Sequence, residues 1–404
     1  MARTRHLTDL DRLVLALSDA FDLVGVDRLG HCRRVAAMAV AVAEELCWHK
    51  ATIRMLMHAA LLHDCGVSTT GEHHDLMGDL SWNVANEHSV RGAECLKRIP
   101  ELAHLAAIVA EHHTPWGSMG DRLPEDEALI ANLIHLVDRI DAKRNHCGVM
   151  GRNIVSILTR HTGFFSPELL AAADQVTRCE AFWFFQEEPV LTERLTSFIW
   201  RWKPIPLDLP AVLRVAEVVG AIIDRKSTYT EHHSLGVARV AGLLARWSDL
   251  APDTCTGIEI AAYLHDIGKL RIPDQLLDKQ GTLDPIERMR MARHAFDTRA
   301  ILTRAFGEGG IADWAGFHHE CLSGNGYPFH LEAEFLSLET RIVAVADVFQ
   351  ALAQQRPYRA PLTIAEIGAL MDGMVFAGRL DHDVVELCKA HGEECWTAAT
   401  QGDN

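Results

Sequence analysis

Histidine and aspartate recur in this sequence in an order that could hold metal ions. The chain of 404 residues contains 23 histidines, many of them clustered. Imidazole and carboxylate ligands together suit manganese, iron or zinc, and a carboxylate can bridge two ions. A metal pair about 3.5–4 Å apart can hold a bridging hydroxide and clamp both reacting oxygens of a phosphoryl displacement. Five histidines and two aspartates of the second half therefore predict such a site: His233, His265, Asp266, His294, His318, His319 and Asp347.

The first half of the chain carries a matching series, which indicates an internal duplication. The first two histidines are 32 residues apart in both halves, and the third precedes a histidine pair by 24 residues in both. A single histidine on a helix is more often a core residue than a ligand, but an ordered, repeated series of ligand types indicates a duplicated domain. The residues of this first series are His31, His63, Asp64, His88, His112, His113 and Asp138.

Helical periodicity is frequent in both halves, whereas strand signals are almost absent. Val35, Met38, Ala39 and Val42 follow the spacing of one helix face. Residues 202–210 contain three prolines, which a helix should not cross. We therefore predict an all-α fold of two tandem helical bundles, with an N-terminal domain over residues 1–200, a proline-rich linker over 201–210 and a C-terminal domain over 211–404.

The composition limits the partners of this protein. The formal net charge of −16 argues against a broad DNA- or RNA-binding surface. No apolar run approaches the roughly 20 residues that span a bilayer, and no secretory signal opens the sequence, so we expect a cytoplasmic protein without a membrane partner. The ten scattered cysteines are expected to be free thiols.

The repeated pattern resembles that of the HD-domain phosphohydrolases, and residues from about 211 to 400 resemble the HD-GYP subfamily. Each bundle is then expected to be of the HD type. The resemblance rests on motifs that follow one another in the family's order. They are Tyr229–Ser234, Leu264–Lys269, Ile272–Asp274, His294, His318–Glu320, Gly324–Pro328, Arg341–Asp347 and Arg356–Arg359.

The resemblance implies a role for each matching residue. One divalent ion, iron or manganese, would be bound by His233, His265 and Asp347. A second would be bound by His294, His318 and His319, with Asp266 bridging the two. Asp266 and Lys269 would be catalytic, because a lysine beside the metals can neutralise charge on the phosphoryl oxygens. Candidate substrate-binding residues are Lys269, Gly326, Tyr327, Pro328, Arg356 and Arg359. An exposed lysine, a simple turn and surface salt bridges remain the alternatives for these residues.

Two departures from the family pattern affect the C-terminal half. Cys321 and Ser323 replace the usual arginine and aspartate of a loop linked to substrate and partner recognition. Some family members hold a third metal through two further carboxylates, but Tyr229 and Gln350 stand at those positions here. We therefore predict a two-metal centre, with the linear dinucleotide as its product.

The N-terminal half keeps the ligand series but differs around it. Asp27 and Asp141 stand at the two extra carboxylate positions, so they join its possible second metal site. Val67 replaces the lysine, and the residues after the histidine pair, Thr114–Gly117, form no Gly-Tyr-Pro loop. This half is predicted to be a metal-binding HD domain of undetermined activity; a metal-free relic is the alternative.

The leading functional hypothesis is hydrolysis of cyclic di-GMP to the linear dinucleotide or on to GMP. The first alternative is a phosphodiesterase for 3'3'-cyclic GMP-AMP, because a few hydrogen bonds from the altered loop could change base selection. A catalytically weak signalling scaffold and a phosphomonoester hydrolase are further alternatives. A homodimer or a diguanylate cyclase partner also remains open.

Overall fold

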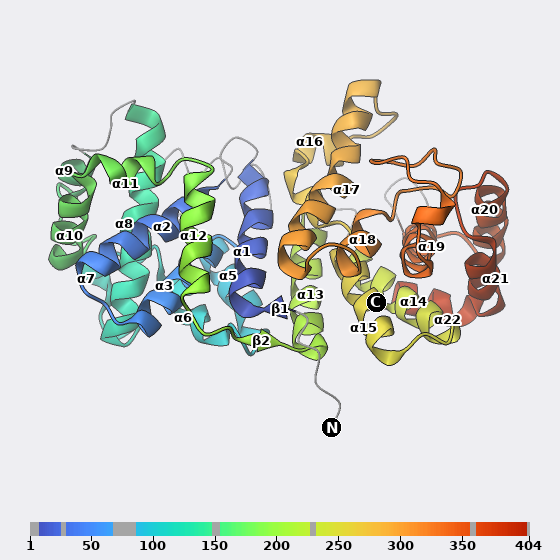
Figure 1. Ribbon diagram of the computed structural model, residues 1–404, viewed down its shortest axis with the longest axis horizontal. Coiled ribbons are helices and arrows are strands. Elements are labelled where there is room, and N and C mark those ends of the chain that lie inside the picture. Colours follow the sequence, from blue (N-terminus) through green and yellow to red (C-terminus); the bar gives the residue numbers. More distant parts are fainter. Residues whose placement is uncertain are drawn as a thin grey trace. The chain divides into compact units, whose positions relative to one another are not determined.

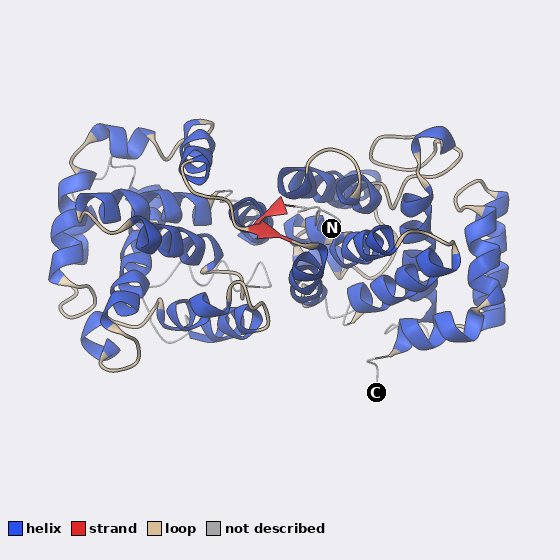
Figure 2. Ribbon diagram, turned by 60° about the horizontal axis from the view of Figure 1, so that its bottom comes forward, coloured by secondary structure: helices blue, strands red, loops and turns tan. Residues whose placement is uncertain are grey.

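The computed structural model describes residues 8–25, 30–67, 86–147, 154–226, 232–355 and 361–401. The chain divides into two compact units: Asp9–Ile205, here the N-terminal domain, and the chain from Pro206 on together with Thr8, here the C-terminal domain. Strands β1 (Thr8–Asp9) and β2 (Pro206–Leu207) form a two-stranded sheet. Apart from this sheet and one isolated bridge, the described segments are helices, turns and loops (Figure 2). The predicted all-α fold is confirmed.

The N-terminal domain is a bundle around helix α2 (Figure 1). Its elements are α1 (Leu10–Phe21), η1 (Asp22–Gly25), α2 (His31–Glu45), α3 (Lys50–Leu62), α5 (Asn86–Lys97), η2 (Ala103–Leu105), α6 (Ala106–Glu111), α7 (Trp116–Met119), α8 (Glu125–Cys147), α9 (Ile154–Leu158), α10 (Pro167–Thr177), α11 (Glu180–Phe184) and α12 (Val190–Trp200).

The C-terminal domain repeats the order of these helices around α14. Its helical elements are α13 (Leu209–Asp224), α14 (His233–Trp247), α15 (Pro252–Leu264), η3 (Ile267–Arg271), α16 (Asp274–Leu277), α17 (Pro285–Phe306), α18 (Ile311–Gly316), η4 (Ala333–Phe335), α19 (Leu338–Ala353), α20 (Ile364–Phe376), α21 (His382–Ala390) and α22 (Gly392–Thr400).

The central helices are buried on more sides than their periodicity predicts. The face of α2 that the periodicity predicts is fully buried. Ala36, Ala37 and Val40, which lie on other faces of the helix, are fully buried too. Helix α2 contacts α1, α3, α8, α10 and α12, and α14 is likewise packed against α13, α15, α19, α21 and α22. Small side chains on the other faces allow this close packing. The first histidine of each series is therefore the first residue of a helix that neighbouring helices pack against on several sides.

A buried aspartate holds the start of each central helix. Asp22 Oδ1 accepts a hydrogen bond from the backbone N–H of Cys32 at 2.8 Å, and Asp224 Oδ2 accepts one from Ser234 at 3.0 Å. Each carboxylate satisfies a free N–H of the first helical turn and lies at the positive end of the helix dipole. These two repeated aspartates therefore position the helices that carry the first histidines.

A repeated glycine lets another helix pass close to each His-Asp pair. A Cβ atom on Gly66 would lie 2.0 Å from the carbonyl oxygen of His88, and one on Gly268 would lie 2.0 Å from that of His294. No side chain fits at such a distance, so both positions require glycine. This close approach brings the third histidine of each series next to the His-Asp pair.

The prolines of residues 202–210 separate two helices as predicted. Helix α12 ends at Trp200, and α13 begins at Leu209 with Pro210 in its first turn. The side chain of Asp208 caps α13 by accepting a hydrogen bond from Ala211 N at 2.9 Å.

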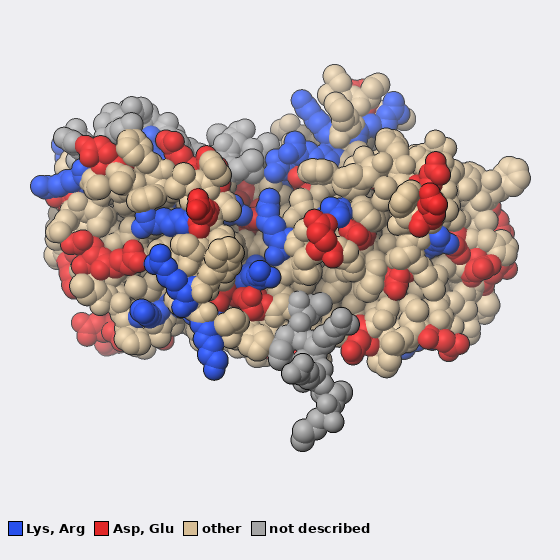
Figure 3. All heavy atoms as spheres, viewed as in Figure 1, with Lys and Arg blue, Asp and Glu red and all other residues tan. Residues whose placement is uncertain are grey.

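The surface mixes both signs of charge. On the face drawn in Figure 3, acidic and basic side chains are interspersed over each domain.

Among the described residues, no helix combines the length and the apolar character that crossing a membrane requires.

Candidate metal centres

The structure brings all seven predicted ligands of the C-terminal domain together. The ligand atoms of His233, His265 and Asp347 lie within 4.8 Å of one another, and so do those of a second group, His294, His318 and His319. The Asp266 carboxylate lies between the two groups. Its Oδ2 is 3.2 Å from His265 Nε2 and 3.6 Å from His233 Nε2, whereas its Oδ1 is 3.5 Å from His294 Nε2 and 3.9 Å from His318 Nε2.

Local backbone geometry aims the histidine rings of this centre. His265 directly follows α15, His318 lies two residues after the end of α18, and His294 lies within α17. Each donates its Nδ1–H to the carbonyl oxygen three residues earlier, at 2.6–2.7 Å. Because a carbonyl can only accept, the proton is on Nδ1, and the Nε2 lone pair points to the centre.

Buried atoms of the centre fit the binding of cations. Among the described residues, His294 Nε2, His318 Nε2 and Asp266 Oδ1 are buried and make no hydrogen bond. A buried polar atom without a partner costs on the order of 1–3 kcal/mol. Lone pairs from imidazole and carboxylate that converge in this way are what a first-row divalent ion requires.

The electrostatics of the two histidine groups differ. Burial lowers the pKa of His294 to about 4 and that of His318 to about 3, so both are neutral at pH 7, the form that binds metal. Burial also opposes protonation of His265, but the charges of Asp266 and Asp347 outweigh it and raise its pKa to about 9. Burial opposes ionisation of Asp266, yet His265 and Lys269 hold the pKa of this carboxyl well below its usual value.

Lys269 lies directly against the central carboxylate. Its Nζ is 2.5 Å from Asp266 Oδ2, and its side chain keeps 21% of its exposure while that of Asp266 keeps 2%. The ammonium group therefore lies between the buried ligands and solvent, where it can meet an anionic substrate.

The Gly-Tyr-Pro loop is packed against the histidine pair. The Tyr327 ring centroid is 4.7 Å from that of His319. The Glu320 carboxylate accepts hydrogen bonds from the backbone N–H groups of Phe329 at 2.7 Å and Leu331 at 2.9 Å. A Cβ on Gly326 would lie 2.3 Å from Cys321 N, so the loop can only approach this closely with glycine there.

The loop segment that differs from the family pattern contains Ser323. Ser323 N donates to Gly378 O at 2.9 Å, so the altered segment packs on the turn after α20. Pro328 follows Tyr327 in the loop. Arg356, Arg359 and Tyr229 lie outside the described residues.

One residue with a part in this centre was missed by sequence reasoning. From the sequence, Gln350, on α19, is notable only because some family members have a metal-binding carboxylate at its position. In the structure its Oε1 lies 2.5 Å from His233 Nδ1, and both side chains are buried. Because an amide oxygen can only accept, this contact places the proton on Nδ1 and directs His233 Nε2 to the centre. The available signal was the repeated position, where Asp141 stands in the first half.

We expect Gln350→Ala to weaken metal binding about 10–100-fold, the usual effect of removing a partner that orients a ligand. The reason is that His233 loses the acceptor for its Nδ1–H. Metal titration followed by elemental analysis measures the effect. Gln186→Ala is the matched control, because it removes a buried glutamine of the other domain that bonds to Phe182 O. Equal metal affinity in both variants would contradict the orienting role.

The N-terminal domain brings the first ligand series together in the same way. His31, His63 and Asp64 form one group of ligand atoms within 4.8 Å of one another, and His88, His112 and His113 form another. Asp64 lies 3.3 Å from both His63 Nε2 and His88 Nε2, through different oxygens. Asp138 Oδ1 is 3.4 Å from His31 Nε2.

The two extra carboxylates of this half do not both join the cluster. Asp141 lies behind His31: its Oδ2 is 2.8 Å from His31 Nδ1, on the ring edge away from the other ligands. The Arg34 guanidinium donates to both of its oxygens, at 2.7 and 2.9 Å. Asp141 therefore orients His31 as Gln350 orients His233. Asp27 lies outside the described residues.

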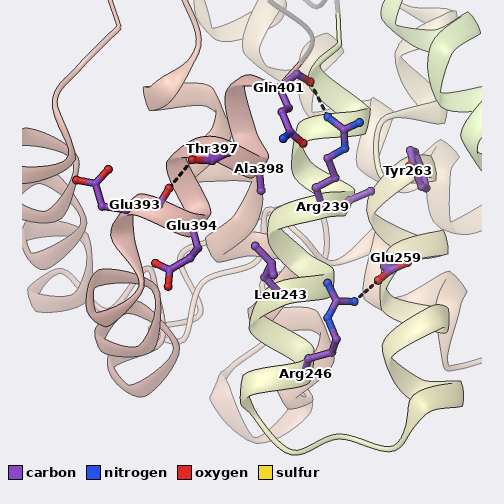
Figure 4. Close-up of a pocket in the computed structure, with 11 residues that line it drawn as sticks. Arg239, Leu243, Arg246, Glu259, Tyr263, Glu393, Glu394, Thr397, Ala398 and Gln401 are labelled. Atoms are coloured by element: carbon purple, nitrogen blue, oxygen red, sulfur yellow. Dashed lines mark hydrogen bonds and ion pairs between the residues drawn. The ribbon is translucent and has the colours of Figure 1, made fainter.

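A separate cavity of about 550 Å³ lies between α14, α15 and α22 of the C-terminal domain (Figure 4). Arg239 donates to Gln401 O at 2.6 Å, and Arg246 donates to Glu259 Oε1 at 2.7 Å. The residues around it include none of the predicted ligands.

Comparison with known proteins agrees with the duplication. Two family models described as HD domain match this chain, one over residues 28–144 and one over residues 217–384. The chain is 31% identical over 400 residues, 96% of its length and 92% of the relative's, to the 3'3'-cGAMP-specific phosphodiesterase 1 of Vibrio cholerae. It is 35% identical to phosphodiesterase 3 of that series, over 73% of this chain and 64% of the relative. A cyclic di-GMP phosphodiesterase of Thermotoga maritima is 35% identical over 161 residues, 38% of this chain and 43% of the relative.

A solved structure shows the same fold over nearly the whole length. The crystal structure of a cyclic GMP-AMP specific phosphodiesterase of V. cholerae matches this chain with a TM-score of 0.65 at 23% sequence identity. The match covers 98% of this chain and 97% of the chain in that structure. The geometry of both histidine clusters, the two family models and the full-length relative agree. The chain belongs to the HD-domain phosphohydrolase superfamily and carries two HD domains in tandem.

Proposed function

We propose that the C-terminal domain hydrolyses a phosphodiester bond of a cyclic dinucleotide and releases the linear dinucleotide. The observation that carries this proposal is the convergence of five imidazoles and two carboxylates directly beside Lys269 and Tyr327. This ligand set suits two divalent ions, iron or manganese, with Asp266 between them. Such ions, when bound, supply Lewis acidity and an activated water for attack on phosphorus.

The chain's own residues then bind and orient the substrate. Lys269 neutralises charge on the phosphoryl oxygens, since its ammonium lies at the exposed side of Asp266. Tyr327, held by Gly326 and Pro328 and by the Glu320 contacts, offers a ring beside His319 on which a base can rest. Arg356 and Arg359 remain candidates for the second phosphate or a guanine edge.

Between the two cyclic dinucleotides, the relatives favour the mixed one. The two V. cholerae proteins that match this chain over 96% and 73% of its length are both named as specific for 3'3'-cGAMP. The Thermotoga protein named for cyclic di-GMP matches 38% of the chain. We therefore place 3'3'-cyclic GMP-AMP first and cyclic di-GMP second. We also propose that the protein acts in the cytoplasm, either as a homodimer or with a diguanylate cyclase partner.

Product analysis tests this proposal. Protein loaded anaerobically with Fe(II) or Mn(II) is incubated separately with 3'3'-cyclic GMP-AMP, cyclic di-GMP, a linear dinucleotide and p-nitrophenyl phosphate. We expect linear dinucleotides from both cyclic substrates, with the higher kcat/KM for the mixed one. Hydrolysis of the monoester alone would indicate a phosphomonoesterase. Turnover of none by metal-loaded protein would favour a signalling scaffold and refute the proposal.

A further inference from the structure

The turn that carries the His-Asp pair of the C-terminal domain, residues 265–269, holds three functional groups of the centre. His265 and Asp266 are candidate ligands, and Lys269 contacts the Asp266 carboxylate. The turn is closed by a hydrogen bond from Lys269 N to Asp266 O at 2.8 Å. It follows the end of α15, where the last carbonyl groups of a helix have no helical partner. The position of this turn therefore depends on hydrogen bonds from other parts of the fold.

Thr298, on α17, supplies two of these hydrogen bonds. Its Oγ1 donates to His265 O at 2.9 Å and accepts from Gly268 N at 3.1 Å. A hydroxyl group has one proton and two lone pairs, so both bonds can form at once. Thr298 is fully buried, so neither backbone group can exchange this partner for bulk water. A single hydroxyl thus holds the backbone on both sides of Asp266.

The same helix also holds the end of η3, the segment that follows the His-Asp pair. Asp297 Oδ2 lies 2.8 Å from Arg271 Nε. In the sequence, Lys269 lies between the anchored residues 265–268 and Arg271. Helix α17 carries the candidate ligand His294 as well. One helix therefore fixes a metal ligand, the central carboxylate and the lysine relative to one another.

The N-terminal domain forms the same turn without this hydroxyl. Val67 N donates to Asp64 O at 2.9 Å, which closes the turn as in the other half. Gly92 corresponds to Thr298, because a Cβ on the turn glycine would lie 2.5 Å from Gly92 N in one half and 2.9 Å from Thr298 N in the other. Val67 stands at the position of the lysine. The turn therefore folds without the hydroxyl, and the hydroxyl is found in the half that carries the lysine.

We propose that Thr298 is a positioning residue of the C-terminal centre, whose hydroxyl holds Asp266 and Lys269 in the arrangement that hydrolysis requires. This inference rests on the proposed function of that centre. Thr298 acts through the turn and not on the substrate, because it is fully buried and its hydroxyl is bonded to the backbone on both sides of Asp266. Reaction rates respond strongly to such positioning, since a displacement of about 1 Å can cost a hundredfold.

Thr298→Val tests this role, because it keeps the branched shape and removes the hydroxyl. The full-length chain also carries Asp64→Ala, so that metal bound in the N-terminal cluster does not enter the measurement. We expect Mn(II) titration followed by elemental analysis to show about tenfold weaker binding, as for other residues that orient ligands. With the better cyclic dinucleotide and saturating Mn(II), kcat should fall about ten- to a hundredfold. KM should change by less than about twofold, because the substrate does not contact Thr298.

Thr303→Val is the matched control. Thr303 lies on the same helix, and within the described part of the chain its buried Oγ1 makes no hydrogen bond. This variant should keep the wild-type kcat and Mn(II) affinity. Thr298→Ser, which restores the hydroxyl, must recover most of both. A thermal melt shows whether each variant is folded, and if Thr298→Val is not, Thr298→Ala takes its place because it cannot overpack the site.

A folded variant without the Thr298 hydroxyl that keeps the wild-type kcat overturns the proposal, and so does a Thr298→Ser variant that recovers neither quantity. If the parent chain hydrolyses no cyclic dinucleotide, the proposed function fails and Mn(II) affinity alone decides the role of Thr298. Affinity that is lost in Thr298→Val and restored in Thr298→Ser then supports the positioning role. Equal affinity in Thr298→Val and Thr303→Val refutes it.

Discussion

Asp266→Ala is expected to abolish hydrolysis of cyclic dinucleotides, with a loss of at least about 10³-fold in kcat. The reason is geometric: the two oxygens of Asp266 face different histidine groups, so that both groups lose their shared anionic partner at once. Elemental analysis should show that the metal of the C-terminal centre is lost as well. Steady-state kinetics with the better cyclic substrate measures the effect.

Asp383→Ala is the control for this change, because its side chain is 97% exposed on α21 of the same domain. A thermal melt of both variants separates loss of the site from loss of the fold. Asp266→Asn, which keeps the shape and removes the charge, should be as inactive as the alanine variant. Wild-type turnover by a folded Asp266→Ala protein would disprove the bridging role.

Lys269→Ala is expected to lower kcat about 10²–10³-fold while the metal content stays at the wild-type level. Lys269 Nζ contacts the Asp266 carboxylate but supplies no lone pair to a metal, so its loss should affect the charged transition state and leave the ligands in place. A larger effect on kcat than on KM is the expected kinetic signature, because charge on the phosphoryl oxygens develops during reaction.

Lys279→Ala offers the matched control, since this lysine lies in the same domain, is 37% exposed and pairs with Glu287. Lys269→Arg should recover part of the rate, because it restores the charge with a different shape. If Lys269→Ala loses metal together with activity, the lysine holds Asp266 in place, and a direct role toward the phosphate is wrong.

The candidate ligands could be recognised from the sequence because they are repeated. Spacings of 32 and 24 residues recur in both halves, and each histidine falls at a comparable place on a helix, such as the start of α2 and of α14. The direction of several rings is also a local property, because the Nδ1–H of His265 or His63 bonds a carbonyl only three residues away.

The repeat also marks the positions of Gln350 and Asp141, but it does not show that these residues contact the first histidine of each series. Gln350 reaches His233 across 117 residues, and Asp141 reaches His31 across 110. Both contacts depend on how α19 packs on α14 and α8 on α2, which no local periodicity encodes. The sequence places Asp141 in a possible metal site, and the structure adds that its carboxylate contacts both Arg34 and His31 Nδ1.

The sequence by itself determined the helical class, the duplication and the seven candidate ligands of each half, because a repeated order of imidazoles and carboxylates is visible without coordinates. Tertiary structure alone decided the burial of α2 and α14 and the partners of His31 and His233. These features arise from helices that are distant in the chain and close in space. Their energies come from packing and from charges brought together only when the helices dock.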